Sequence, residues 1–187
     1  MTTALKIVAV SGGTSRPSRT LALTEAIIDA ISRQLNIDTH LIELGNIARP
    51  LGGAQWRNEL PETVEHELRH IESADLLIVA APVYRGTYPG LFKHLFDLIG
   101  QDALIDTPVL LAATGGSERH ALVLDHQLRP LFSFFQALTL PIGVYASEAD
   151  FADYRIVNPA LQARVELAAE RATGVLSYQA HVLRKIA

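Results

Sequence analysis

The sequence predicts an α/β fold: a doubly wound, five-stranded parallel sheet with helices on both faces. Five short apolar segments rich in β-branched residues alternate with segments of helical periodicity. Most of the apolar segments are continuously apolar, which is typical of parallel strands buried on both faces. A length of 187 residues suits one well-buried domain and is short for two, so we expect a single domain over residues 1–187.

The elements follow from these patterns in chain order. Five strands are expected, at Leu5–Val10, Asp38–Leu44, Leu76–Ala80, Pro108–Ala113 and Leu138–Tyr145. Five helices are expected: from an N-cap at Ser18 to Leu35, over Glu62–Ser73, from Pro89 to Ile99, over Glu118–Gln136, and from Asn158–Pro159 through Val175. Pro130 should kink the fourth helix, because proline inside a helix removes a hydrogen bond and clashes with the preceding turn.

The composition excludes several classes of function. A hydrophobic fraction of 49% excludes a disordered chain, and a net charge of −4 gives no basic footprint for nucleic acid. The seven histidines are scattered without a metal-ligand spacing, so no metal site is expected. The chain has no cysteine, which excludes thiol chemistry and iron–sulfur clusters. Redox chemistry in this chain would therefore need a bound cofactor.

We expect a cytoplasmic protein that is not bound to a membrane. The segment Met1–Lys6 lacks the basic region and the apolar stretch of a signal peptide. The longest apolar segments, such as Ala74–Val83, are interrupted by Asp75 and Pro82 and cannot span a bilayer.

The turn after the first strand, Ser11–Thr20, has the composition of an anion site. In open α/β sheets, ligands bind beyond the carboxyl ends of the strands. This turn offers glycines, hydroxyls and arginines directly before a helix N-terminus, whose free N–H groups favour a phosphate. The candidate ligands are Gly13, Thr14, Ser15, Arg16, Ser18, Arg19 and Thr20. The turn matches neither the dinucleotide fingerprint nor the triphosphate loop, so it suits a monophosphate such as FMN; an ordinary solvated turn is the alternative.

The turns after the third and fourth strands complete the candidate site. Prolines stiffen both ends of the third-strand turn, and its tyrosines could pack beside a ring, although such tyrosines are often surface filler. In the fourth-strand turn, glycines allow close backbone approach, and two N–H groups could donate to a ring that gains negative charge on reduction. The candidates are Pro82, Val83, Tyr84 and Arg85 in one turn and Thr114, Gly115, Gly116 and Ser117 in the other.

We expect no catalytic side chain. The sequence has no Ser-His-Asp order and no paired-carboxylate spacing, and the adjacent Asp125 and His126 cannot share a helix face. Hydride transfer between a nicotinamide and a flavin depends on stacking and orientation more than on an acid or a base.

Taken together, the three turns resemble the NAD(P)H-dependent FMN reductase family. The resemblance is carried by Gly12–Thr20, by Ala81–Tyr84 followed by Gly90–Lys93, and by Ala113–Gly116. It extends from Ile7 to about Tyr154 and is strongest to the branch that supplies reduced flavin to alkanesulfonate and methanesulfonate monooxygenases.

The resemblance implies a flavodoxin-like sheet in the order 2-1-3-4-5 and a homodimer or homotetramer. It also implies that NADH or NADPH reduces FMN and that FMNH₂ passes to a separate monooxygenase. The phosphate would fall on Thr14, Ser15, Arg16, Ser18 and Arg19, and the isoalloxazine on Pro82–Arg85 and Thr114–Ser117. This chain departs from many relatives in two ways: Val83-Tyr84-Arg85 replaces Glu-Tyr-Asn, and the loop arginine, Arg16, stands one position later.

The fourth helix resembles a helix at the subunit interface of the sulfonate branch, where it has a bulged turn. His126 stands where a close relative carries tyrosine. A π-bulge is often functional, so we hypothesise that His126 marks an oligomer contact that gates flavin release. An exposed helical histidine is the alternative.

Two other functions and one segment remain open. The same fold could keep FMN and reduce a quinone, an azo dye or a metal oxyanion, or it could serve as a flavodoxin-type electron carrier. A carrier usually has a strongly acidic docking face, of which a net charge of −4 gives little sign. The segment Ile47–Leu60 has no clear periodicity and predicts a surface loop pinned by Trp56, with a subunit contact or a flavin-edge loop as alternatives.

Overall fold

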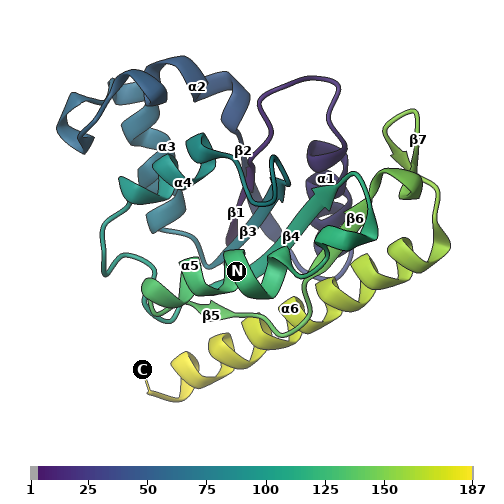
Figure 1. Cartoon of the computed structure of the whole chain (residues 1–187). Helices are drawn as coiled ribbons and strands as arrows, with labels where there is room; N and C mark the ends of the chain where they lie inside the picture. Colours follow the sequence, from purple (N-terminus) through teal and green to yellow (C-terminus); the bar gives the residue numbers. More distant parts are fainter. Residues whose placement is uncertain (1–3, 187) are drawn as a thin grey trace.

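In a computed structural model that describes residues 4–186, with side chains to residue 178, six strands form one parallel sheet. Its strands are β1 (Leu5–Ser11), β2 (Ile37–Glu43), β3 (Leu76–Pro82), β4 (Pro108–Gly115), β5 (Leu138–Thr139) and β6 (Val144–Ser147). Their order is β2-β1-β3-β4-β5, and β6 also pairs with β4 (Figure 1). The predicted flavodoxin-like order is therefore confirmed.

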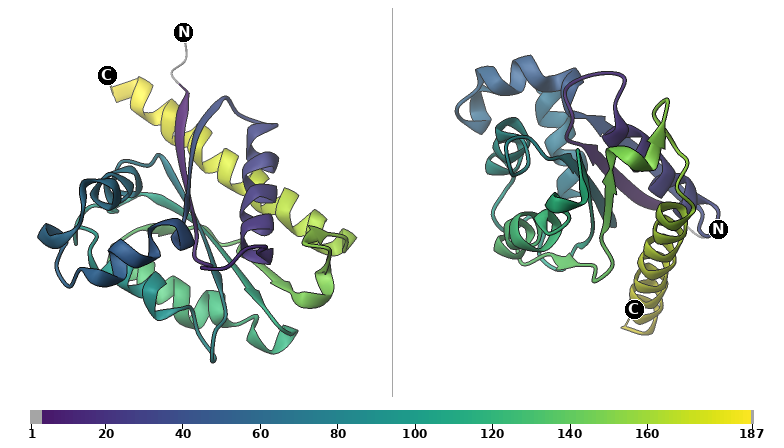
Figure 2. Two further views of the ribbon diagram at one scale, coloured as in Figure 1. Left: turned by 90° about the horizontal axis from the view of Figure 1, so that it is seen from above. Right: turned by 45° about the vertical axis from the view of Figure 1, so that its right-hand side comes forward.

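Helices cover both faces of the sheet, as Figure 2 shows from two sides. One face packs on α1 (Arg19–Ser32) and α6 (Pro159–Ile186). The other packs on α3 (Glu62–Glu72), α4 (Gly90–Asp97) and α5 (Arg129–Phe134). Successive residues of the central strands alternate between these two cores, so the strands are buried on both sides. This double burial explains their continuously apolar sequences.

The prediction of one strand over Leu138–Tyr145 was wrong. Two short strands, β5 and β6, replace it, and both lie beside β4. Pro141 lies in the gap between them and has no N–H to donate to a ladder. The chain therefore leaves β4 after Leu140, whose N–H donates to the Val109 carbonyl at 2.9 Å, and returns at Val144.

The prediction of a surface loop over Ile47–Leu60 was also wrong. Helix α2 (Leu44–Gly53) covers the first half of this segment and contains Pro50, and a 3₁₀ turn follows at Arg57–Glu59. Burial of Leu44 and Leu51 stabilises a helix whose proline and glycines are poor helix formers. The side chain of Trp56 is 62% exposed and pins nothing.

The predicted helix over Glu118–Gln136 is divided into three parts. A 3₁₀ turn at Glu118–His120 precedes a π-helix at Leu124–Leu128, and α5 follows. The bulged turn implied by the resemblance is present and contains His126. The kink predicted at Pro130 was wrong, because this residue lies in the first turn of α5, where a missing N–H costs little.

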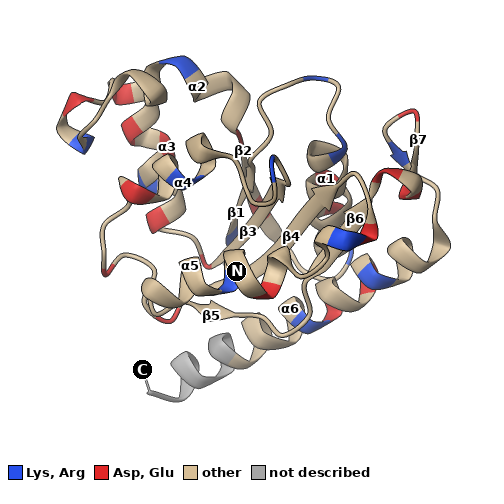
Figure 3. Ribbon diagram, in the orientation of Figure 1, with Lys and Arg blue, Asp and Glu red and all other residues tan. Residues whose placement is uncertain are grey.

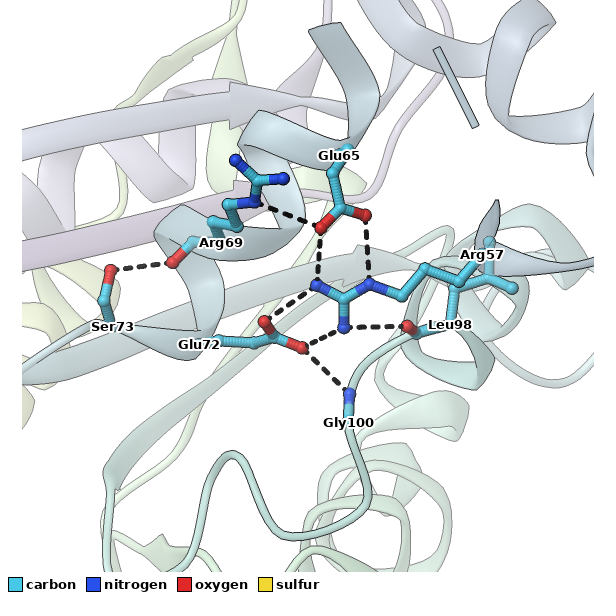
Figure 4. Close-up of polar contacts among 7 residues, drawn as sticks. All are labelled: Arg57, Glu65, Arg69, Glu72, Ser73, Leu98 and Gly100. Atoms are coloured by element: carbon cyan, nitrogen blue, oxygen red, sulfur yellow. Dashed lines mark hydrogen bonds and ion pairs between the residues drawn. The ribbon is translucent and has the colours of Figure 1, made fainter. Parts of the chain in front are cut away.

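The connection between α2 and α3 is fastened by Arg57 (Figure 4). Its guanidinium donates to both carboxylate oxygens of Glu65 at 3.0 and 2.9 Å and to Glu72 at 2.9 Å. Glu72 also accepts the N–H of Gly100 at 2.9 Å, which ties α3 to the chain after α4. Hydrogen bonds from Arg57 hold the pKa of the Glu65 carboxyl below its ordinary value.

No helix within residues 4–186 is long and apolar enough to cross a membrane. Of the amino-terminal segment Met1–Lys6, residues 1–3 lie outside the described part of the chain.

Replacing Arg57 should destabilise the fold and make its stability depend less on pH. In Arg57→Ala, two half-buried carboxylates lose their partner. We expect the free energy of unfolding at pH 7 to fall by about 2 kcal/mol, a value between those typical of exposed and of buried ion pairs. The Glu65 contribution is present above its unfolded pKa and is lost as pH falls through the lower folded pKa. The difference between wild type and variant should therefore shrink on acidification below about pH 4.

Denaturant unfolding at pH 7 and in the acid range measures both effects. Arg69→Ala is the matched control, because the exposed Arg69 makes one longer bond, of 3.2 Å, to the same carboxylate. An equal loss in Arg69→Ala, or a difference that does not change with pH, would contradict this account of the network.

Candidate functional site

Three turns meet at the carboxyl edge of the sheet because their strands end at matching levels. Ser11 pairs with Ala80, Pro82 with Thr114, and Gly115 with Ser147. Between the turns lies a mainly polar cleft of about 290 Å³. Its lining consists of Ser15, Pro17, Ser18, Arg19, Thr20, Pro82, Val83, Tyr84, Thr114, Gly115, Gly116 and Tyr154.

The turn after β1 presents free backbone donors to this edge. Ser18 caps α1, and its hydroxyl accepts the Leu21 N–H at 3.2 Å. Within residues 4–186, no acceptor pairs with the backbone N–H groups of residues 13–16. Together with the positive end of α1, these donors make the turn suitable for an anion.

Two contacts fix this turn on the sheet. The hydroxyls of Thr20 and Thr114 share a buried hydrogen bond of 2.6 Å, which joins the first turn of α1 to the end of β4. The N–H of Gly12 donates to the Ala80 carbonyl at 2.7 Å. A Cβ at Gly12 would lie 2.6 Å from a ring carbon of Phe92, so only glycine allows this close approach.

The turn after β4 is held by Tyr145. The phenol donates to the Ser117 carbonyl at 2.6 Å, and burial raises the pKa of Tyr145. The same phenol occupies the space beside Gly115, where a Cβ would lie only 2.2 Å from the oxygen. The shape of the Gly115–Ser117 backbone is therefore set by one tyrosine on β6.

The turn after β3 is a tight reversal at the open side of the cleft. Tyr84 N–H donates to the Thr87 carbonyl at 2.7 Å, and Arg85 and Gly86 between them have φ of 53° and 96°. Val83 N–H donates to the Thr114 carbonyl at 2.7 Å, which ties this turn to the neighbouring one. Tyr84 lines the cleft and is partly exposed.

Most of the predicted site residues come together in this cleft, and some do not. Gly13, Thr14, Arg16, Arg85 and Ser117 lie outside the residues that line it. Arg16 forms an ion pair with Glu43 at the end of β2, and this hydrogen bond raises the pKa of Arg16. Figure 3 shows that the arched turn after β1 and the turn after β3 both carry basic residues.

Sequence reasoning missed Pro17 and Tyr154 as lining residues. Pro17 lies inside the predicted anion turn, so its position alone could have indicated it. Tyr154 belongs to a small hairpin, β7 (Phe151–Ala152) and β8 (Arg155–Ile156), whose turn lacks the Asn-Gly or Asp-Gly pair that signals such hairpins.

His126 lies beside another cleft. A larger and more apolar cavity of about 590 Å³ lies between α4 on one side and the π-helix and α5 on the other. His126, Tyr88 and Phe134 are among its lining residues. Phe134 and the nearby Leu122 are each more than 60% exposed. An apolar surface of this kind is typical of a protein contact, whereas the polar cleft at the strand ends has the donors that a nucleotide needs.

Comparison with known sequences assigns the chain to a family. Residues 5–152 match the family model described as NADPH-dependent FMN reductase. The chain is 71% identical over 187 residues to the NADH-dependent FMN reductase SfnE of Pseudomonas putida, and the match covers both proteins completely. It is 66% identical over 184 residues to an FMN reductase (NADPH) of Pseudomonas aeruginosa, covering 98% of this chain and 99% of the relative.

Solved structures show the same fold. An oxidoreductase from Corynebacterium diphtheriae has a TM-score of 0.82 and 33% identity, with 94% of this chain and 98% of that chain covered. The apo form of an NADH:FMN oxidoreductase named EMOB has a TM-score of 0.81 and 27% identity, with 90% and 88% covered.

Proposed function

The chain belongs to the NADPH-dependent FMN reductase family, and we propose that it is the reductase of a two-component system. In this proposal it transfers hydride from NADH or NADPH to FMN and supplies FMNH₂ to a separate alkanesulfonate- or methanesulfonate-type monooxygenase. The observation that carries the proposal is the polar cleft at the start of α1 and the turn that borders it, in which the backbone N–H groups of residues 13–16 have no acceptor within residues 4–186.

We propose that donors in the cleft and in the turn beside it hold an FMN monophosphate. The free N–H groups from Gly13 to Arg16 and the hydroxyls of Thr14, Ser15, Ser18 and Thr20 would hold the phosphate, with Arg19 at the edge of the cleft. Arg19 is ion-paired with Glu148, and Arg16 with Glu43. On binding FMN, each arginine would either leave its carboxylate partner for the phosphate or contact both groups.

The two other turns fit the ring system of a flavin. Pro82, Val83, Tyr84 and Arg85 would lie on one side of it, and Thr114, Gly115, Gly116 and Ser117 on the other. The Tyr145 phenol holds this turn through the Ser117 carbonyl, and the N–H groups of Gly116 and Ser117 in the same turn would donate to the electron-rich edge of the ring. Bound there, FMN would supply the hydride acceptor, and the protein would orient it and leave its exposed side open to a nicotinamide.

The open cleft supports release of the product. Ser15, Tyr84 and Gly116 are exposed, so no buried wall closes over the ligand from these turns. A diffusible product is what a two-component system requires. A cytoplasmic location is part of the same proposal, because nicotinamide nucleotides are drawn from the cytoplasm.

Steady-state kinetics test the proposal. We expect FMN-dependent oxidation of NADH or NADPH, saturating at micromolar free FMN, as for a typical enzyme substrate. NADH and NADPH are compared in the same assay, because one relative is named for NADH and another for NADPH. Tight retention of FMN with rapid electron transfer to a quinone would favour the FMN-retaining alternative. Absence of NAD(P)H oxidation would favour the electron carrier and contradict the proposal.

We propose further that the face around His126 forms a homodimer or homotetramer contact that gates flavin release. The exposed Leu122 and Phe134 flank the π-helix that contains His126, and apolar side chains in this position favour burial against another subunit.

His126→Ala should therefore shift the protein towards smaller assemblies and change its affinity for FMN. Light scattering measures the first effect and flavin fluorescence titration the second. The gating hypothesis fails if oligomeric state and FMN affinity both remain those of the wild type.

A further inference from the structure

A hairpin far along the chain supplies one wall of the cleft. Strands β7 and β8 pair antiparallel, Phe151 with Ile156 and Ala152 with Arg155, and Asp153 and Tyr154 form the turn between them. Figure 2 shows the hairpin beside the turn that precedes α1. Tyr154 is the residue of this hairpin that reaches the cleft.

Tyr154 occupies a backbone conformation that suits glycine better. Asp153 has φ of 46° and Tyr154 has φ of 61°, both in the left-handed region. Aspartate tolerates this region, but a bulky aromatic residue is rarely found there. A two-residue hairpin turn of type I′ needs positive φ at both central positions, so what is unusual here is the choice of tyrosine for the second one.

The surroundings place the ring at the phosphate end of the cleft. The guanidinium of Arg19 lies 5.6 Å above the centre of the Tyr154 ring, at a distance that allows a cation–π contact. Arg19 is the first residue of α1, directly after the Ser18 cap, and it also pairs with Glu148 just before the hairpin. Arg19 therefore fastens the hairpin to the helix end that would hold the phosphate.

The base of the hairpin is anchored independently of any ligand. The buried Asp150 carboxylate accepts the N–H and the hydroxyl of Ser147 at 2.6 and 2.9 Å and the side-chain amide of Asn158. Its backbone carbonyl accepts the Val157 N–H at 2.9 Å. Both ends of the segment are thus fixed to one residue, which holds the base of the hairpin that carries Tyr154 in place.

We propose that Tyr154, held by Arg19, closes the phosphate end of the cleft and selects FMN against FAD. FAD is FMN with its phosphate joined to AMP, so it fits only where the chain continues freely beyond the phosphate. A ring and an ion pair at that position exclude the larger flavin by steric clash. The inference rests on the proposed binding of FMN in this cleft, and it assigns Tyr154 as a specificity-determining residue.

Equilibrium titration with FMN and FAD, without nicotinamide, tests this assignment. The quantity is the ratio of the Kd for FAD to the Kd for FMN, from flavin fluorescence. Tyr154→Gly removes the ring and keeps a residue suited to the left-handed backbone, and we expect the ratio to fall at least about tenfold, a change of 1.4 kcal/mol. Tyr154→Phe keeps the ring, so its ratio should stay within about twofold of the wild type, well under 1.4 kcal/mol.

Asp153→Gly is the matched control, because it loosens the same turn at a residue that does not line the cleft. Its ratio should remain that of the wild type. An unchanged ratio in Tyr154→Gly, or an equal fall in Asp153→Gly, overturns the proposal.

If Tyr154→Gly does not fold, Tyr154→Asn serves in its place, since asparagine also tolerates this conformation. Failure of nicotinamide oxidation by the wild type would affect the proposed function alone, because the titration needs no reduction.

Discussion

The parallel alignment of the central strands is the constraint on which the site depends. The parallel ladders of β1, β3 and β4 place their carboxyl ends at one edge and bring their turns together, and burial of these strands on both faces stabilises the sheet. The residues of these turns reach the cleft because they follow directly after the strands. Tyr154 is the exception, since a separate hairpin carries it to the same edge.

Short polar contacts then give the turns a fixed shape. The Thr20–Thr114 hydroxyl pair joins the helix that starts the anion turn to the strand that ends beside it, and Tyr145 holds the turn after β4 through the Ser117 carbonyl. Phe92 packs against the backbone at Gly12 and Tyr145 against the backbone at Gly115, so closely that neither position has room for a side chain. The cleft is thereby largely formed before a ligand binds, which lowers the ordering cost of binding.

The sequence was sufficient to predict the fold and the meeting of three turns at one edge of the sheet, because strand burial and glycine-rich strand ends are local patterns. It was insufficient where tertiary contacts override local preference. Burial of Leu44 and Leu51 makes a helix of a segment with Pro50, and Pro141 divides a segment that is apolar enough to be one strand. The pairing of Arg16 with Glu43 and the place of Tyr154 depend on residues distant in sequence, and no pattern in either segment indicates them.

The central claim, that the start of α1 holds the phosphate of FMN, is tested most directly by comparing FMN with riboflavin, which has the same ring system and no phosphate. Equilibrium titration of the wild type and of Ser18→Ala gives four dissociation constants. We predict that the wild type binds FMN at least about tenfold more tightly than riboflavin, since each hydrogen bond to a charged group contributes about 1.5–3 kcal/mol. We also predict that Ser18→Ala narrows this difference and leaves riboflavin affinity nearly unchanged. Equal affinity of the wild type for the two flavins would contradict the account.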